Sequence, residues 1–124
     1  MTLQTQRRVL ILDDERIIAN TLALILNRSG FEARAVYNAK DAIEAARLLS
    51  PDFLISDVVM DGSTGIDAAI QIAELVPMCR IILFSGQAVT ADLLERAEAG
   101  GHHFELLVKP IHPRALIQRL NELH

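Results

Sequence analysis

Five short apolar runs, separated by longer segments with helical periodicity, limit how this chain can fold more than any other feature of its sequence. The runs are 9–12, 31–36, 53–55, 81–84 and 106–108. Four of them are continuously apolar, which is typical of parallel strands that helices cover on both faces. In 31–36, charged residues alternate with apolar ones. We therefore predict that 31–36 forms an edge strand.

The segments between these runs carry the spacing of amphipathic helices. We predict helices over 15–28, 39–49, 65–75, 90–99 and 113–123. In the second of these, Ala42, Ile43, Ala46 and Leu49 recur at intervals that place them on one helical face. Strands that alternate with helices form parallel sheets through right-handed crossovers. The sequence therefore predicts an open α/β sandwich with a five-stranded parallel sheet.

Composition narrows the class of protein. A chain of 124 residues with 51% hydrophobic and 23% charged residues is expected to be one globular domain rather than a disordered segment. A net charge of −4, with four Phe, one Tyr and no Trp, argues against direct binding of nucleic acid. No apolar stretch reaches the roughly 18–20 residues of a membrane span, and the single Cys79 fits a reducing compartment. We expect a soluble cytoplasmic protein that contacts neither nucleic acid nor a membrane directly.

Reactive polar residues follow four of the five apolar runs. They are Asp13, Asp14 and Glu15 after the first run, Asp57 after the third, Ser85 after the fourth and Lys109 after the fifth. Ligands of open α/β sheets bind at the carboxyl ends of the strands, so these side chains are predicted to meet. Crowded carboxylates either raise their pKa values or take up a cation, for which Mg²⁺ or Mn²⁺ is suited by its preference for oxygen ligands. A lysine and a hydroxyl beside such a metal provide what a phosphoryl group requires.

Taken together, these residues resemble a response-regulator receiver domain of two-component signal transduction, with the stand-alone fold of chemotaxis regulators. The resemblance covers about Arg8 to Leu123. Its motifs are, in order, Val9-Leu10-Ile11-Leu12-Asp13-Asp14-Glu15, Asp57-Val58-Val59-Met60, Gly65-Ile66-Asp67, Ser85-Gly86 and Lys109-Pro110. The resemblance implies a flavodoxin-like (βα)5 sandwich with strand order 2-1-3-4-5. It also implies an N-terminal tail over 1–7 and a receiver domain over 8–124.

The resemblance implies a phosphoacceptor and a metal site. Asp57 would take a phosphoryl group from a histidine kinase or a histidine phosphotransfer protein. Asp13, Asp14 and Asp57, together with the backbone carbonyl of Val59, would hold Mg²⁺, with Mn²⁺ as a possible substitute. Such a domain is a switch rather than an enzyme, limited to self-phosphorylation and self-dephosphorylation. Its output would pass to an effector domain or a downstream protein through the surface formed by 90–99, 106–108 and 113–123.

Further residues would contact the phosphoryl group itself. Lys109 would pair with it and hold the carboxylate beforehand, and the bond from Lys109 to Pro110 is expected to be cis, which only bonds before proline adopt at low cost. The Ser85 hydroxyl would turn inward to donate a hydrogen bond. The backbone amides that would add further donors are those of Val58, Val59 and Gly86.

Among the departures from the usual family pattern, two bear on switching and on hydrolysis. Leu106 stands three residues before the lysine, where an aromatic residue is usual, and Phe104 lies two residues earlier. We therefore predict that the common coupling of an inward-turned serine to an aromatic ring does not operate here. Val59 is apolar and cannot orient a hydrolytic water, so our hypothesis gives that role to Gln87.

Other interpretations remain open from the residues alone. A receiver-like module could dock to partners without taking up phosphate, although the complete set of strand-end residues argues against it. A phosphatase of the haloacid-dehalogenase type also uses a strand-end aspartate, but it needs an acidic residue where Val59 stands. The apolar surplus of the first helix, which includes Ile17 and Leu24, is either ordinary exposure or a docking surface for the helical bundle of a phosphodonor.

Overall fold

The computed structural model describes residues 6–60, 63–86, 95–96, 98–102 and 104–123. The strands are β1 (Arg8–Leu12), β2 (Glu32–Val36), β3 (Phe53–Asp57), β4 (Val59–Met60), β5 (Ser63–Thr64), β6 (Arg80–Ser85) and β7 (Glu105–Val108). The helices are α1 (Arg16–Arg28), α2 (Ala39–Leu49), α3 (Gly65–Leu75) and α5 (Pro113–Glu122). Within these ranges no helix is both long and apolar enough to cross a membrane.

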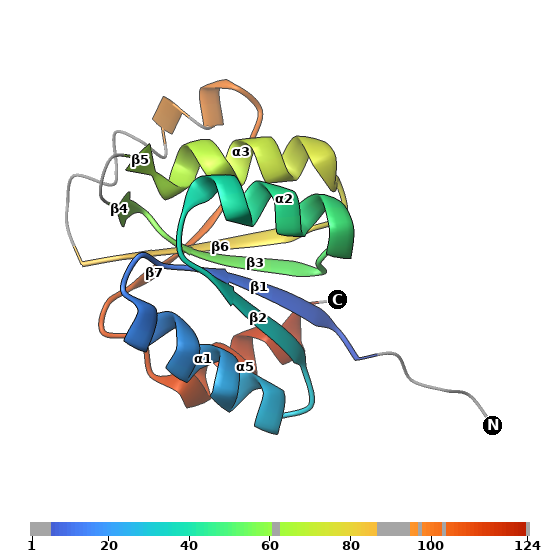
Figure 1. The fold of residues 1–124 in the computed structure, drawn as a ribbon. Coiled ribbons are helices and arrows are strands. Elements are labelled where there is room, and N and C mark those ends of the chain that lie inside the picture. The colour runs from blue at the N-terminus through green and yellow to red at the C-terminus, as the bar shows by residue number, and fades with distance from the viewer. Residues whose placement is uncertain (1–5, 61–62, 87–94, 97, 103, 124) are drawn as a thin grey trace.

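The long strands form one parallel sheet in the order β2-β1-β3-β6-β7, while β4 and β5 form a small antiparallel pair. Counted along the chain, the order of the long strands is 2-1-3-4-5, so the predicted topology is confirmed. Figure 1 shows α1 and α5 on one face of the sheet and α2 and α3 on the other. Side chains of the central strands alternate between two apolar cores. Leu10 packs toward α2 and α3, for example, and Ile11 packs toward α1 and α5.

Most element positions agree with the prediction. Helices α2 and α3 have the predicted bounds, whereas α1 begins and α5 ends one residue inside the predicted limits. The edge position of 31–36 is confirmed, since β2 has only β1 as a neighbour. Most of the predicted helix 90–99 lies outside the described residues.

The prediction that the last strand is buried on both faces is wrong. β7 forms the second edge of the sheet, and its residues alternate between partly buried and exposed. Leu107 packs against the core under α1 and α5, whereas Leu106 is 37% exposed and Val108 is 70% exposed. A continuous apolar run does not distinguish an edge strand from a central one, because the number of neighbouring strands is a property of the topology.

A side chain of α1 covers part of the open edge of β2. The Asn27 carboxamide donates to the Ala33 carbonyl at 3.1 Å and accepts from the Ala33 amide at 2.7 Å. The preceding amide, of Glu32, donates to the Arg7 carbonyl on the β1 side. Since successive amides of a strand point to opposite sides, the Ala33 amide points outward. Asn27 therefore makes the hydrogen bonds that a further strand would make.

The start of the sheet is tied to the end of α5 by Arg7. Its guanidinium donates to the carbonyls of Leu120 at 2.9 Å and Leu123 at 3.3 Å. The same group lies over the rings of Phe31 and Phe53, with its central carbon 4.9 and 5.6 Å from their centroids. A cation that bonds the last carbonyls of a helix also complements the negative end of the helix dipole.

Candidate functional site

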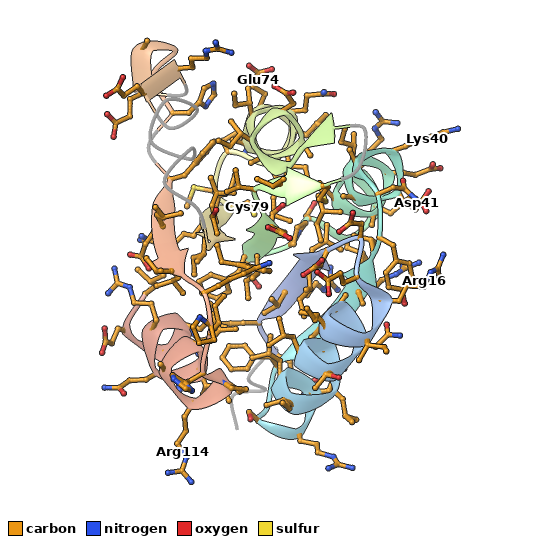
Figure 2. The ribbon with its side chains drawn as sticks, turned by 90° about the vertical axis from the view of Figure 1, so that its left-hand side faces the viewer. Arg16, Lys40, Asp41, Glu74, Cys79 and Arg114 are labelled. Atoms are coloured by element: carbon orange, nitrogen blue, oxygen red, sulfur yellow. The ribbon has the colours of Figure 1, made fainter. Side chains whose placement is uncertain are left out.

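Three aspartates meet where β1 and β3 end. Asp13 and Asp14 follow β1, Asp57 is the last residue of β3, and each offers a carboxylate oxygen within 4.8 Å of the others. Figure 2 is viewed from the edge of the sheet at which these strands end. The strands are direct neighbours in register, with Leu12 opposite Ser56, and this pairing brings the residues that follow them together.

Two of the three carboxylates are buried. Asp13 is 0% exposed and Asp57 is 4% exposed, whereas Asp14 faces solvent. Burial raises the pKa of Asp13 to about 6; the Glu15 amide, which donates to Oδ1 at 2.9 Å, lowers this pKa, and the charge of Asp57 raises it. The other oxygen of Asp13, Oδ2, is buried and has no hydrogen-bond partner among the described residues. Such an oxygen is costly unless it is protonated or meets a cation.

The carboxylate of Asp57 is held from two sides. Lys109 Nζ lies 3.1 Å from Oδ2, and the Val59 amide donates to Oδ1 at 3.3 Å. The lysine ammonium also lies 5.2 Å from the centroid of the buried Phe84 ring. The peptide bond from Lys109 to Pro110 is cis, which confirms the prediction from the sequence. Within the described part of the chain, each oxygen of Asp57 thus has a donor before any ligand is bound.

Of the predicted backbone donors after Asp57, Val58 does not face the carboxylate. Its amide donates to the Phe84 carbonyl at 3.1 Å, which joins the loop to β6. In this structure the Val58 amide is engaged with β6, and its predicted role as a donor to a phosphoryl group stays a prediction. The bend that follows β3 turns the Val58 amide toward the neighbouring strand, and the sequence pattern does not encode that direction.

The return of the chain from this loop explains a glycine in the motif Gly65-Ile66-Asp67. A Cβ atom on Gly65 would lie 1.8 Å from the Asp57 carbonyl oxygen and 2.6 Å from Ser56 Oγ. The Gly65 amide donates to the Val58 carbonyl at 2.8 Å and closes the loop. The first residue of α3 thus packs directly on the backbone of Asp57. The motif in the sequence identifies Gly65 but does not predict this contact.

Ser85 and Lys109 are placed side by side by the pairing of β6 with β7. Ser85 is opposite Val108 in register, it is buried, and its carbonyl accepts from the Lys109 amide at 3.1 Å. Gly86 follows, and a Cβ there would lie 3.7 Å from the Lys109 Cβ, an ordinary contact distance. Gln87, for which we hypothesise a role in hydrolysis, lies outside the described residues.

Phe104 lies away from these strand ends. It precedes β7, stacks on His102 with 5.9 Å between ring centroids, and packs partly buried against the core under α2 and α3. Ile82 is opposite Glu105 in register, so Phe104 lies near the beginning of β6, whereas Ser85 is its last residue. The Phe104 ring is therefore at the opposite end of the strand from the Ser85 hydroxyl.

The aspartate cluster fits a hard divalent cation. All the side-chain ligands on offer are carboxylate oxygens, which Mg²⁺ and Mn²⁺ prefer. One carboxylate oxygen of each aspartate lies within 4.8 Å of the others, so the three side chains could contribute to one cation site. The unpartnered Oδ2 of Asp13 is the atom that gains most from such an ion.

Comparison with known proteins agrees with this geometry. A family model, the response regulator receiver domain, matches residues 9–121. The chain belongs to this family. It is 33% identical over 118 residues to the chemotaxis protein CheY of Thermotoga maritima, which covers 94% of this chain and 97% of that protein. The chain spans about half the length of other curated relatives that it matches.

Solved receiver domains have the same fold. A CheY-like receiver domain protein from Methanospirillum hungatei superimposes with a TM-score of 0.85 at 22% identity, covering 95% of this chain and 93% of the other. A response regulator from Burkholderia pseudomallei, solved with a phosphorylated aspartic acid and a calcium ion, gives a TM-score of 0.79 at 26% identity, covering 90% and 65%. The acidic pocket of Asp13, Asp14 and Asp57 is thus the pocket of a receiver domain.

Proposed function

We propose that this receiver domain is a phosphoacceptor, in which Asp57 takes a phosphoryl group from a histidine kinase or a histidine phosphotransfer protein in a reaction that requires Mg²⁺. The observation that carries the proposal is the 3.1 Å contact of Lys109 with Asp57 inside a cluster of three carboxylates. Phosphorylation would change the surface formed by segment 90–99, β7 and α5 and thereby signal to an effector domain or a downstream protein. We further propose a cytoplasmic location, where Cys79 stays reduced.

The transfer is a displacement at phosphorus. An oxygen of Asp57 attacks the phosphorus of the phosphohistidine, a P–O bond forms, the P–N bond breaks, and the electron pair stays on the imidazole nitrogen of the donor. The product is an acyl phosphate on Asp57. The chain also reacts with small phosphodonors and later loses the group to water, which makes it a switch with self-phosphorylation and self-dephosphorylation rather than an enzyme.

The side chains around Asp57 have separate tasks. Lys109 holds the carboxylate before the reaction and pairs with a phosphoryl oxygen after it. The Ser85 hydroxyl and the amides of Val59 and Gly86 donate hydrogen bonds to the remaining oxygens. Mg²⁺, held by Asp13, Asp14, Asp57 and the Val59 carbonyl, offsets the charge of the phosphoryl group when it is bound, and Mn²⁺ suits the same oxygen ligands.

The phosphodonor is proposed to dock beside α1. An apolar hollow of about 460 Å³ lies between α1 and the segment before α5, lined by Ile18, Leu22, Phe84, Lys109, Pro110 and Ile111. Ile17 is 83% exposed and Leu24 is 52% exposed on the same helix. An apolar surface beside the reactive lysine suits the helical bundle that carries a phosphohistidine. Ile17→Glu and Leu24→Glu are expected to slow transfer from a protein donor and to leave transfer from acetyl phosphate unchanged.

Intact mass measured after incubation with acetyl phosphate and Mg²⁺ tests the phosphoacceptor. We expect the gain of one phosphoryl group, its loss when the metal is chelated, and no gain for Asp57→Asn. Absence of any gain from acetyl phosphate and from a protein donor, in a protein that binds Mg²⁺ by calorimetry, would contradict the proposal. That result would favour the alternative of a receiver-like module that docks without phosphorylation.

A further inference from the structure

An arginine stands at the rim of the acidic pocket with its guanidinium held in place. Arg16 is the first residue of α1 and follows Asp13-Asp14-Glu15 directly. Its central carbon lies 4.2 Å from the centroid of the Tyr37 ring. The Tyr37 hydroxyl donates to Asn20 Oδ1 at 2.5 Å, one helical turn further along α1. The ring therefore fixes the plane of the guanidinium, and Asn20 fixes the ring.

This stack lies on the same edge of the sheet as the aspartates. Tyr37 follows Val36, the last residue of β2, and the Val36 carbonyl accepts from the Asp13 amide at 3.2 Å. Figure 2, which looks onto this edge, labels Arg16 between the ribbons of α1 and α2. The guanidinium therefore lies on the side of the pocket where β2 ends.

The helix dipole does not explain a cation at this position. The start of a helix carries the positive end of its dipole, which disfavours arginine there. Among the described residues Arg16 has no hydrogen bond or ion pair, and the stack on Tyr37 is its one specific contact. Its N–H donors are therefore available, and stacking has already restricted the side chain. Both properties favour binding of an anion with two adjacent oxygens.

The pocket carries more negative charge than one divalent cation and one lysine offset, so its field disfavours the approach of a negatively charged phosphodonor. Asp13, Asp14, Glu15 and Asp57 place four carboxyl groups at or next to the site, and the ammonium of Lys109 is already paired with Asp57. A doubly negative phosphodonor meets this field before it meets the acceptor. A cation at the rim raises the local concentration of such donors.

We propose that Arg16, held by Tyr37, is an anion-recognition residue that captures small acyl phosphates on their way to Asp57, a role that rests on the phosphoacceptor function proposed above. Arg16 takes no part in bond making. It acts on the rate of productive encounter, so its contribution grows with the negative charge of the donor and shrinks as salt screens that charge.

The initial rate of Asp57 phosphorylation by acetyl phosphate, followed by intact mass with saturating Mg²⁺, tests this role. At low ionic strength we expect Arg16→Gln to lower the rate about three-fold, and in 0.5 M salt we expect the difference to vanish because charges are screened within a few ångströms. Phosphoramidate carries less negative charge than acetyl phosphate at neutral pH, and its rate should fall less. Arg16→Lys retains the charge and should keep most of the rate.

Three further variants separate charge from structure. Arg28→Gln removes the same charge from the other end of α1, about 18 Å along the helix axis, and should leave the rate unchanged. Tyr37→Leu releases the guanidinium and should give an intermediate rate, whereas Tyr37→Phe keeps the ring under the guanidinium, loses only its bond to Asn20, and should be closer to the wild type than Tyr37→Leu is.

The outcomes distinguish this role from the function on which it rests. Equal rates for the wild type and Arg16→Gln at low salt would overturn the role of Arg16 and leave Asp57 as the acceptor. A loss that is the same for both donors and at all salt concentrations would also overturn it, because it would indicate a distorted site. Failure of the wild type itself to gain a phosphoryl group would count against the phosphoacceptor function instead.

Discussion

Replacing Gly65 with alanine tests how rigidly the phosphoacceptor strand is held. The added methyl group would lie 1.8 Å from the Asp57 carbonyl oxygen, so the two must separate by roughly 1.5 Å to reach van der Waals contact. Neither side can yield easily. Asp57 pairs with Phe84 of β6, and the buried Ser56 hydroxyl lies 2.6 Å from the same methyl position.

The expected cost follows from these contacts. Overpacking of this kind costs about 1–3 kcal/mol, and weakening the hydrogen bond from the Gly65 amide to the Val58 carbonyl costs about 1 kcal/mol more. The higher helix propensity of alanine offsets up to about 1 kcal/mol of this loss of unfolding free energy. We expect Gly65→Ala to lose about 2–3 kcal/mol of unfolding free energy, which lowers Tm by about 10 °C in a domain of this size.

Thermal and urea unfolding followed by circular dichroism measure this loss. Gly86→Ala is the matched control, because among the described residues its methyl group would meet only Lys109 Cβ, at an ordinary contact distance of 3.7 Å. We expect it to stay within about 0.5 kcal/mol of the wild type. If Gly65→Ala destabilises the protein no more than Gly86→Ala does, the loop between β3 and α3 yields freely and the reasoning is refuted.

Three further predictions concern the site and the ends of the fold. The pKa of Asp13 is about 6 in the folded chain against 3.8 ordinarily, so its stabilising contribution is complete below pH 4 and is lost as the pH rises through 6. In metal-free protein we expect a loss of about 2 kcal/mol between pH 4 and 7 that Asp13→Asn abolishes in urea titrations; identical pH profiles would contradict the pKa. Lys109→Met should reduce phosphorylation by acetyl phosphate at least about 100-fold while calorimetry shows tighter Mg²⁺ binding, because a cation beside Asp57 is removed; weaker Mg²⁺ binding would show that the lysine organises the carboxylates. Arg7→Met should lower the unfolding free energy by about 1–2 kcal/mol in thermal denaturation, with Arg28→Met as a near-neutral control; equal losses would show that Arg7 does not hold α5.

The residues at the strand ends were predictable because a parallel sheet brings the carboxyl ends of its strands to one edge. Asp13 and Asp57 needed only the assignment of β1 and β3 as neighbours to be placed together, and the resemblance to receiver domains supplied that order. The same reasoning placed Lys109 beside Ser85. The chemistry of the site is thus encoded in the order of elements and in the residue that follows each one.

What the sequence did not predict depends on the direction of individual backbone groups. The Val58 amide turns to Phe84 rather than toward the carboxylate, and Gly65 returns to within contact of Asp57. Neither can be deduced from periodicity, because both are set by the path of a short loop. The exposure of Val108 was missed for a different reason, since an apolar run contains no information on how many strands flank it.

The carboxamide of Asn27 affects whether copies of this domain associate through the β2 edge at high concentration. A strand from another molecule that sought to lengthen the sheet at β2 would first have to displace two hydrogen bonds at Ala33, a loss of about 2 kcal/mol before any gain. The other outward-facing backbone groups of β2 belong to Ala35, and one residue is too short a stretch to hold a strand from another molecule. Asn27→Leu would leave the fold intact and expose the β2 edge of the sheet to pairing with a strand of another molecule. We expect this variant to polymerise as its concentration rises, under conditions in which the wild type does not.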